Sequence, residues 1–257
     1  MQTMKFFISA STDRGGKSAN QDSVCALQLK TPQGPMAFAI LCDGMGGLDH
    51  GELASAAVVR AFRQWALNVL PELCKAPLEE SLIRRHWDTM IQDLNSRIGL
   101  YSQENGTQMG TTAVVMLLTQ TWYFIMNVGD SRAYELTDLL CQITRDHSVV
   151  AREVEAGRIT PEDAEHHPQR NILTRCIGAP RQINGDMFYG RTKKNAVYML
   201  CSDGFRHELT SDELYEHLGP KMLRDPNAMK RNATNLIGLN QKRGETDNIS
   251  VVLVRTY

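Results

Sequence analysis

The sequence predicts a single domain of the α+β class, built on antiparallel sheets. Segments with the length and apolar pattern of strands come in runs, and a pair of long amphipathic helices interrupts them; this order is typical of α+β folds. The 257 residues contain no internal repeat, low-complexity segment or linker, and a chain of this length can bury a substantial core. We therefore interpret residues 1–257 as one domain.

Three strands are predicted at the N-terminal end, because three segments are short, apolar or alternating, and bounded by turn residues. A Thr-Pro-Gln-Gly turn at residues 31–34 joins the second segment to the third, so these two are expected to form a hairpin. The predicted strands are Phe6–Ala10, Ser23–Leu29 and Met36–Cys42.

Two long amphipathic helices follow. Apolar residues recur at helical spacing from Val58 to Val69, and again from Ile83 to Tyr101. Residues at this spacing share one face of a helix, so Trp65 and Trp87 are expected to pack in the core and not to bind a ligand.

The second half of the chain returns to strands and ends with two helices and a strand. Thr210 and Glu213 form a capping box, which predicts the start of one helix. A polar stretch from Asp146 to Ile177 interrupts the strands and has room for one short helix near Val149–Ala156. The strands are predicted at 112–118, 122–128, 133–136, 140–143, 187–189, 197–201 and 249–254, and the last helix at 228–239.

Composition excludes several classes of protein. The formal net charge is −1, with acidic and basic residues intermixed, so the chain lacks the basic footprint of a nucleic-acid-binding protein. No apolar run approaches the roughly 20 residues of a membrane span, and the run Phe6-Phe7-Ile8 is too short for a signal-peptide core. The six dispersed cysteines are expected to be reduced and buried, as in a cytoplasmic protein.

Aspartates stand at the ends of several predicted strands. Asp22 precedes one strand of the predicted hairpin and Asp43 follows the other, so pairing brings these two residues to the same end of the sheet. Asp130, Asp203 and Asp247 occupy comparable positions next to later strands. With antiparallel pairing, all five aspartates can converge on one rim.

Such a cluster suits a hard cation. Carboxylates with no His or Cys spaced beside them favour Mg²⁺ or Mn²⁺, and cations relieve the repulsion among the acids. Gly44 follows Asp43, and because glycine has no Cβ its backbone carbonyl can also reach an ion. The pattern indicates metal-assisted hydrolysis, most naturally of a phosphate ester.

The alternative is that each Asp-Gly marks an ordinary turn, which is the better interpretation of any single one. It does not account for the full pattern. Asp43-Gly44-Met45-Gly46-Gly47 has a form that arises on the order of once per 10⁵ start positions at average residue usage. A hairpin turn does not need three glycines in four residues.

Other phosphate chemistries lack their motifs. No cysteine is followed by an arginine six residues later, so the loop of thiol phosphatases is missing. The chain also has no Asp-x-Asp of aspartyl-phosphate enzymes and no Gly-x₄-Gly-Lys phosphate loop.

The motifs resemble those of the metal-dependent protein phosphatase family, the type 2C Ser/Thr phosphatases, in their bacterial form. The resemblance runs nearly from end to end and keeps the order of the family's motifs. It rests on Thr12-Asp13, Asn20-Gln21-Asp22, Asp43-Gly44-Met45-Gly46-Gly47, Gly110-Thr111-Thr112, Asn127-Val128-Gly129-Asp130-Ser131-Arg132, Asp146-His147-Ser148, Ser202-Asp203-Gly204 and Asp247-Asn248.

The resemblance implies a four-layer α-β-β-α sandwich with two tight Mn²⁺ or Mg²⁺ ions between its central sheets. By position, Asp43 bridges both ions and the carbonyl of Gly44 binds one. Asp203 and Asp247 each hold an ion, and Asp22 acts mainly through water. Asp130 matches a residue that helps to bind a third, weaker ion in bacterial members, and residues 146–177 match the mobile segment called the flap.

Two positions depart from the family pattern. Lys17 stands where the family usually has an arginine that grips the substrate phosphate, and a lysine binds phosphate as a point charge without forking onto two oxygens; the alternative is a solvated surface charge. Met45 stands where eukaryotic relatives have a histidine proposed as general acid. His147 and His167, in or near the flap, are alternative proton donors, although a structural hydrogen bond or simple exposure is the commoner role. Arg132 is expected to be an ion-pair partner.

The function expected from these observations is hydrolysis of phosphoserine and phosphothreonine in proteins by a metal-bridging water. No protein nucleophile is then required. The expected partners are phosphorylated proteins and a Ser/Thr kinase whose action the enzyme reverses, and the protein is expected to be a monomer. Two alternatives are a phosphatase of a small phosphorylated metabolite and a pseudophosphatase that binds phosphoproteins. The retained Asp43, Asp203 and Asp247 argue against the second.

Overall fold

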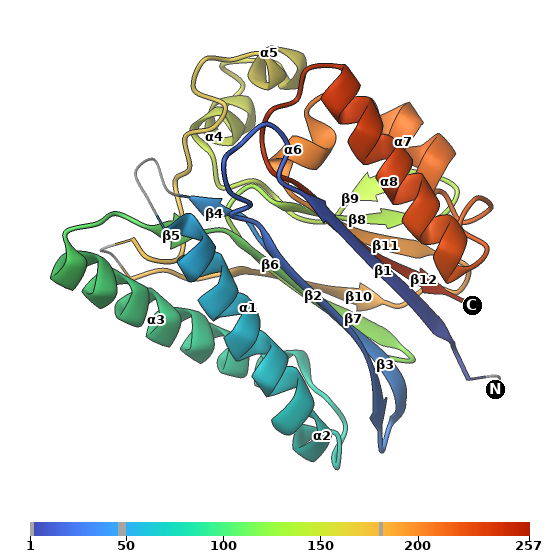
Figure 1. Cartoon of the computed structure of the whole chain (residues 1–257). Coiled ribbons are helices and arrows are strands. Elements are labelled where there is room, and N and C mark those ends of the chain that lie inside the picture. The colour runs from blue at the N-terminus through green and yellow to red at the C-terminus, as the bar shows by residue number, and fades with distance from the viewer. Residues whose placement is uncertain (1–2, 46–49, 180–181) are drawn as a thin grey trace.

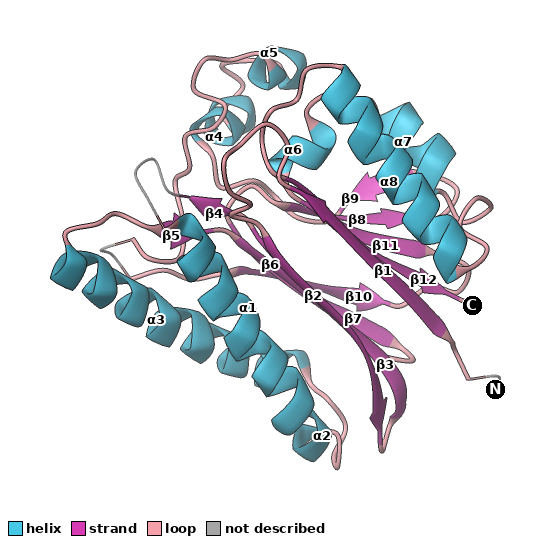
Figure 2. Ribbon diagram, viewed as in Figure 1, coloured by secondary structure: helices cyan, strands magenta, loops and turns pink. Residues whose placement is uncertain are grey.

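A computed structural model of the protein describes residues 3–45, 50–179 and 182–257. Two antiparallel sheets lie face to face at the centre, and helices cover the outer face of each sheet (Figures 1 and 2). The first sheet has the order β1(Phe6–Asp13), β12(Ile249–Thr256), β11(Val197–Cys201), β8(Arg132–Leu136), β9(Leu140–Gln142). The second has the order β10(Asp186–Arg191), β7(Trp122–Val128), β6(Ala113–Leu118), β3(Gly34–Cys42), β2(Ser23–Thr31).

Three layers of apolar side chains hold the sandwich together. One lies between the second sheet and the helices α1(Gly51–Asn68) and α3(Glu80–Asn105), and it contains Trp65 and Trp87. A second lies between the first sheet and α7(Ser211–Leu218) with α8(Pro226–Lys242). The third fills the space between the two sheets. The α-β-β-α architecture is therefore as expected, and the two tryptophans are core residues.

The predicted strands are present, and most of them are longer in the structure than predicted. β1 continues to Asp13 and β12 to Thr256, because the two strands pair along their whole length from Phe6↔Thr256 to Asp13↔Ile249. The capping box of Thr210 and Glu213 is present at the start of α7. The strand predicted at 112–118 begins one residue later, at Ala113, because the backbone N–H of Thr112 donates to the Asp43 carbonyl at 2.8 Å.

Several short elements were not predicted. They are α2(Leu70–Leu73), α5(Pro161–Glu165), α6(Asp203–Arg206), β4(Gly44–Met45) and β5(Gly110–Thr111). Each is too short to show a period in the sequence. The polar stretch 146–177 contains α4(Val149–Glu155) as expected, and α5 in addition (Figure 1).

All six cysteines are free, as expected for reduced thiols. The expectation that they are all buried was wrong for Cys141, which is exposed on the edge strand β9, and Cys25 and Cys176 are only partly buried. In the part of the chain that the structure describes, no helix is both long enough and apolar enough to cross a membrane.

Candidate metal centre

The structure brings the five aspartates to one end of the sandwich, where chain segments from both sheets meet. The hairpin of β2 and β3 pairs Ser23 with Cys42, so Asp22 and Asp43 lie side by side just beyond it. Asp130 lies in the turn between β7 and β8, Asp203 begins α6 after β11, and Asp247 precedes β12. They lie close enough to interact, because the charges of the other four aspartates all raise the pKa of Asp43.

The backbone at Asp43 is fixed by two threonines of the segment after α3. The Asp43 N–H donates to Thr112 Oγ1 at 2.9 Å, and the Asp43 carbonyl accepts from Thr111 Oγ1 at 2.9 Å. A Cβ on Gly44 would lie 2.4 Å from the carbonyl oxygen of Gly51 and 2.5 Å from that of Gln21, so no other residue fits there. The motif's last two glycines, Gly46 and Gly47, lie outside the described residues.

Three of the carboxyls have strongly perturbed pKa values. Asp43 is partly exposed, but protein atoms surround most of its carboxyl group. This loss of solvation, followed by the charges of Asp22 and Asp203, raises its pKa well above the ordinary range. Burial and then the charge of Asp203 raise the pKa of Asp130 to about 7, against a partial lowering by Arg206. Asp22 also rises to a pKa of about 7, mainly through burial, although the Ser250 hydroxyl offsets part of the rise.

Asp22 gives the clearest sign that something is to be bound here. Its side chain is buried, yet neither carboxylate oxygen has a hydrogen bond of acceptable geometry within the described residues. A buried, unpaired carboxylate costs several kcal/mol unless a cation compensates it. Asp43 and Asp130 are also surrounded by protein and repelled by neighbouring carboxylates, so they too require a compensating cation.

Oxygen donors of this kind fit Mn²⁺ or Mg²⁺. No three His, Cys, Asp or Glu side chains converge tightly on a single point within residues 3–45, 50–179 and 182–257. Mg²⁺ is ordinarily held by one or two carboxylates and several waters, so a spread-out cluster suits such ions better than a closed site for zinc. The fit supports hard cations shared among the carboxylates.

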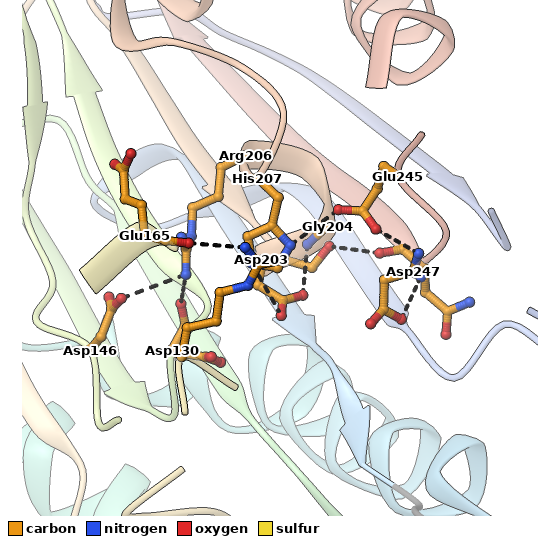
Figure 3. Close-up of polar contacts among 12 residues, drawn as sticks. Asp130, Asp146, Glu165, Asp203, Gly204, Arg206, His207, Glu245 and Asp247 are labelled. Atoms are coloured by element: carbon orange, nitrogen blue, oxygen red, sulfur yellow. Dashed lines mark hydrogen bonds and ion pairs between the residues drawn. The ribbon is translucent and has the colours of Figure 1, made fainter. Parts of the chain in front are cut away.

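Asp203 and Asp247 are held differently from the other three. Asp203 Oδ1 accepts from the Gly204 N–H at 2.6 Å, and Asp247 Oδ1 accepts from the Asn248 N–H at 2.8 Å. A Cβ on Gly204 would lie 2.4 Å from the Asn248 carbonyl oxygen, so the two loops touch (Figure 3). Both carboxylates are thus oriented by the backbone that carries them.

Lys17 lies on the rim of this cluster. Its Nζ is 3.2 Å from Asp247 Oδ1, and its side chain is 50% exposed. The loop that carries Lys17 packs directly on the loop of Asp247, because a Cβ on Gly15 would lie 2.0 Å from the Asp247 carbonyl oxygen. The structure therefore places Lys17 beside the aspartates and in contact with solvent.

Sequence reasoning missed the part played by Asn248. Its Nδ2 donates to the carbonyls of Arg14 at 2.8 Å and Ala19 at 3.1 Å, and its Oδ1 accepts from the Gln21 N–H at 2.8 Å. It thereby fastens the loop of Lys17 and Asp22 to the start of β12. Its place directly after Asp247 was the only available signal.

His147 is a structural residue and is poorly placed to donate a proton. It is buried, its Nδ1 accepts from the Gly129 N–H at 3.1 Å, and its Nε2 lies 3.2 Å from Asp186 Oδ2. Burial lowers its pKa, although the hydrogen bond with Asp186 opposes part of this shift. It fastens the base of the flap, residues 146–177, to the turn that carries Asp130. His167 is partly buried in the second half of that segment, and its Nδ1 accepts from the Gln169 N–H.

The flap is anchored at both ends. Asp146 accepts a bidentate ion pair from Arg132, at 2.7 Å for the closest pair of atoms, which is the structural partnership expected of that arginine. At the other end Ile177 pairs with Thr111, next to the Asp43 backbone. A hollow of about 1060 Å³ opens beside Met45, between the end of the flap and α3.

Comparison with known proteins decides the family. Residues 13–237 match the family model described as Protein phosphatase 2C. The chain belongs to this family. Membership brings its activity, the metal-dependent hydrolysis of phosphoserine and phosphothreonine in proteins, and its Mn²⁺ or Mg²⁺ cofactors. It favours the first of the three functions expected from the sequence over the metabolite phosphatase and the pseudophosphatase.

Individual members resemble the chain over nearly its whole length. It is 34% identical over 249 residues to the serine/threonine phosphatase stp of Listeria monocytogenes, covering 95% of this chain and 93% of that protein. The structure of the S. agalactiae serine/threonine phosphatase superimposes with a TM-score of 0.81 at 30% identity, covering 98% of this chain and 99% of that one. The catalytic domain of PstP in complex with two manganese ions gives a TM-score of 0.77 at 29% identity, covering 99% of each chain.

Proposed function

We propose that the aspartate cluster is the metal centre of this phosphatase and that each member has a distinct role. Asp43 would be a ligand common to two tight ions, the Gly44 carbonyl would bind one of them, and Asp203 and Asp247 would each hold one. Asp22 acts through water, and Asp130 helps to hold a third, weaker ion. The buried carboxylate of Asp22 carries this assignment, since within the described residues neither of its oxygens has a hydrogen bond of acceptable geometry and the nearby hydroxyls of Ser250 and Ser202 only partly offset its burial.

The ions, when bound, supply the attacking water and neutralise charge on the transferring phosphoryl group. The residues of the chain orient the carboxylates and place the substrate. Lys17 binds the substrate phosphate as a point charge from the rim, where its Nζ already lies 3.2 Å from Asp247. No side chain need act as nucleophile, so the protein's contribution is positioning and charge.

Protein substrates fit the surroundings of the cluster. The hollow of about 1060 Å³ beside Met45 gives room for chain that flanks a phosphorylated residue. A second hollow, of about 560 Å³, adjoins it and includes Arg175 at the end of the flap. We propose that residues 146–177 contact the flanks of the phosphorylated serine or threonine.

We also propose that the enzyme reverses the action of a Ser/Thr kinase in the cytoplasm, as a monomer whose residues 1–257 form one catalytic domain. The free cysteines support a reducing compartment. The pairing of β1 with β12 along eight residue pairs supports a single folding unit, because it joins the two ends of the chain. Size-exclusion chromatography with light scattering tests the monomer.

Activity and metal binding test the assignment separately. The wild-type protein should hydrolyse a phosphothreonine peptide with Mn²⁺, lose this activity in EDTA, and regain it with excess Mn²⁺. Titration calorimetry with Mn²⁺ on Asp43→Asn should show that tight binding is lost. Unaltered tight binding in this variant would remove Asp43 from the bridging position.

A further inference from the structure

His207 connects the two aspartates of the C-terminal half of the cluster. It follows α6, and only 11% of its side chain is exposed. Its Nε2 lies 3.7 Å from Asp203 Oδ2, and its Nδ1 lies 3.1 Å from Glu245 Oε2 (Figure 3). One imidazole ring thus faces a carboxylate of the cluster on one side and a second buried carboxylate on the other.

Glu245 continues this connection to Asp247. Its side chain is 9% exposed, and its Oε1 accepts from the backbone N–H of Thr246 and from that of Asp247, both at 2.7 Å. Burial alone would raise the pKa of Glu245, but the hydrogen bonds from His207 and these two N–H groups bring it down to about 2. The two hydrogen bonds from the backbone to Oε1 hold the segment that carries Asp247.

We infer that His207 and Glu245 are positioning residues which fix Asp203 and Asp247 relative to each other and so set the affinity of the metal centre. The two aspartates come from different elements, the start of α6 and the loop before β12. Groups that orient metal ligands commonly govern affinity although they do not touch the metal. The inference rests on the proposed function, because it takes Asp203 and Asp247 as ligands.

A purely structural role for the pair would be to hold α6 in place, but α6 has other attachments. Asn240 of α8 donates from Nδ2 to the Phe205 carbonyl at 2.9 Å, and Gly204 packs directly on the Asn248 carbonyl. The side chain of Asn240 is buried, and among the described residues its Nδ2 donates to the Phe205 and Leu236 carbonyls and not to an aspartate of the cluster. Asn240→Ala therefore loosens α6 without breaking the link between the two aspartates.

The test is Mn²⁺ titration calorimetry on the full chain, with His207→Ala, Glu245→Ala and the double variant. Each single variant should bind Mn²⁺ about 10–100-fold more weakly than wild type, the usual cost of losing a group that orients a ligand. The double variant should bind no more weakly than the worse single variant, because one connection is broken in either case. Glu245→Gln keeps an oxygen for both N–H groups but replaces the oxygen that faces His207 with an amide nitrogen, so its Mn²⁺ affinity should lie between those of Glu245→Ala and wild type.

Three results overturn the inference: wild-type Mn²⁺ affinity in His207→Ala, losses that multiply in the double variant, or an equal loss of affinity in Asn240→Ala. Asn240→Ala should instead lower the melting temperature and leave Mn²⁺ affinity unchanged. Asp203→Asn separates this inference from the proposed metal centre. If Asp203→Asn binds Mn²⁺ normally the ligand assignment fails, whereas a loss in Asp203→Asn with none in His207→Ala removes only the positioning role.

Discussion

The two halves of the aspartate cluster are built in opposite ways. Asp22, Asp43 and Asp130 have raised pKa values, and among the described residues neither oxygen of Asp22 has a hydrogen bond of acceptable geometry. Asp203 and Asp247 each accept a hydrogen bond from the backbone N–H of the next residue. His207 and Glu245 join the two loops. The first half therefore needs cations to compensate its charge, whereas the second half is organised by the protein itself.

This difference predicts the largest effect for Asp43→Asn. The substitution should lower kcat on a phosphothreonine peptide by several orders of magnitude, because it removes a shared ligand. It also removes a charge that four neighbours repel, so the metal-free variant should melt at a higher temperature than metal-free wild type. Kinetics with Mn²⁺ and melting curves in EDTA measure the two effects.

Asp203→Asn is the matched variant from the other half. It should lose turnover to a similar extent, but without the gain in stability, because the amide disturbs an oxygen that already accepts the Gly204 N–H. Equal melting temperatures for the two metal-free variants would contradict the contrast between the halves.

The pH dependence of stability gives the next largest effect. Asp22 and Asp130 have pKa values of about 7 in the folded protein, against an ordinary value of 3.8. A carboxyl with a raised folded-state pKa stabilises the fold below its unfolded pKa and loses this contribution as pH rises through the folded value. The protein in EDTA should therefore melt at a higher temperature at pH 5 than at pH 8.5.

Saturating Mn²⁺ should reverse or flatten that trend, because bound cations stabilise the ionised carboxylates. The expected difference in the metal-free state is a few kcal/mol in the free energy of unfolding, at about 1.4 kcal/mol per pKa unit for each group. If the melting temperature of the metal-free protein does not depend on pH between 5 and 8.5, then ionisation of Asp22 and Asp130 does not destabilise the fold.

The sequence predicted the acids of both halves but not what organises the second. Asp43 and Asp203 were found because each ends an apolar strand and precedes glycine, two local signals. His207 and Glu245 meet only through the fold, and neither lies at the end of a predicted strand. Short elements such as α6 were not predicted, because four residues cannot show a helical period. Cys141 was taken as buried because its apolar neighbours gave no sign of an edge strand.

Lys17 contacts the second half of the cluster from the solvent-exposed side, through its ion pair with Asp247. Lys17→Ala should raise KM for a phosphopeptide more than it lowers kcat, as expected for uniform binding of substrate phosphate. The side chain is half exposed, so the loss of binding free energy should be about 1 kcal/mol, the upper end of the range for an exposed ion pair. Lys17→Arg should lower KM if a forked contact forms.

Steady-state kinetics decide this point, with Lys30→Ala as the control, since Lys30 lies at the opposite end of β2 from the aspartates. Unchanged kinetics in Lys17→Ala would leave Lys17 as a surface charge that merely pairs with Asp247. A fall in kcat without a rise in KM would instead indicate that the loss of its charge disturbs the second half.

The smallest expected effect belongs to the flap, which should alter neither half of the cluster. No side chain of α5 is buried, and the flap is fastened at its base by Arg132 and by the pairing of Thr111 with Ile177, away from α5. Shortening the segment between Glu155 and Glu165 should therefore leave Mn²⁺ affinity and melting temperature near wild type. Because a phosphopeptide extends beyond the metals whereas p-nitrophenyl phosphate does not, kcat/KM should fall several-fold for the peptide and little for the small ester. If the segment instead only packs against the sheets, both activities fall together and the melting temperature drops, and the proposed contact between flap and substrate is wrong.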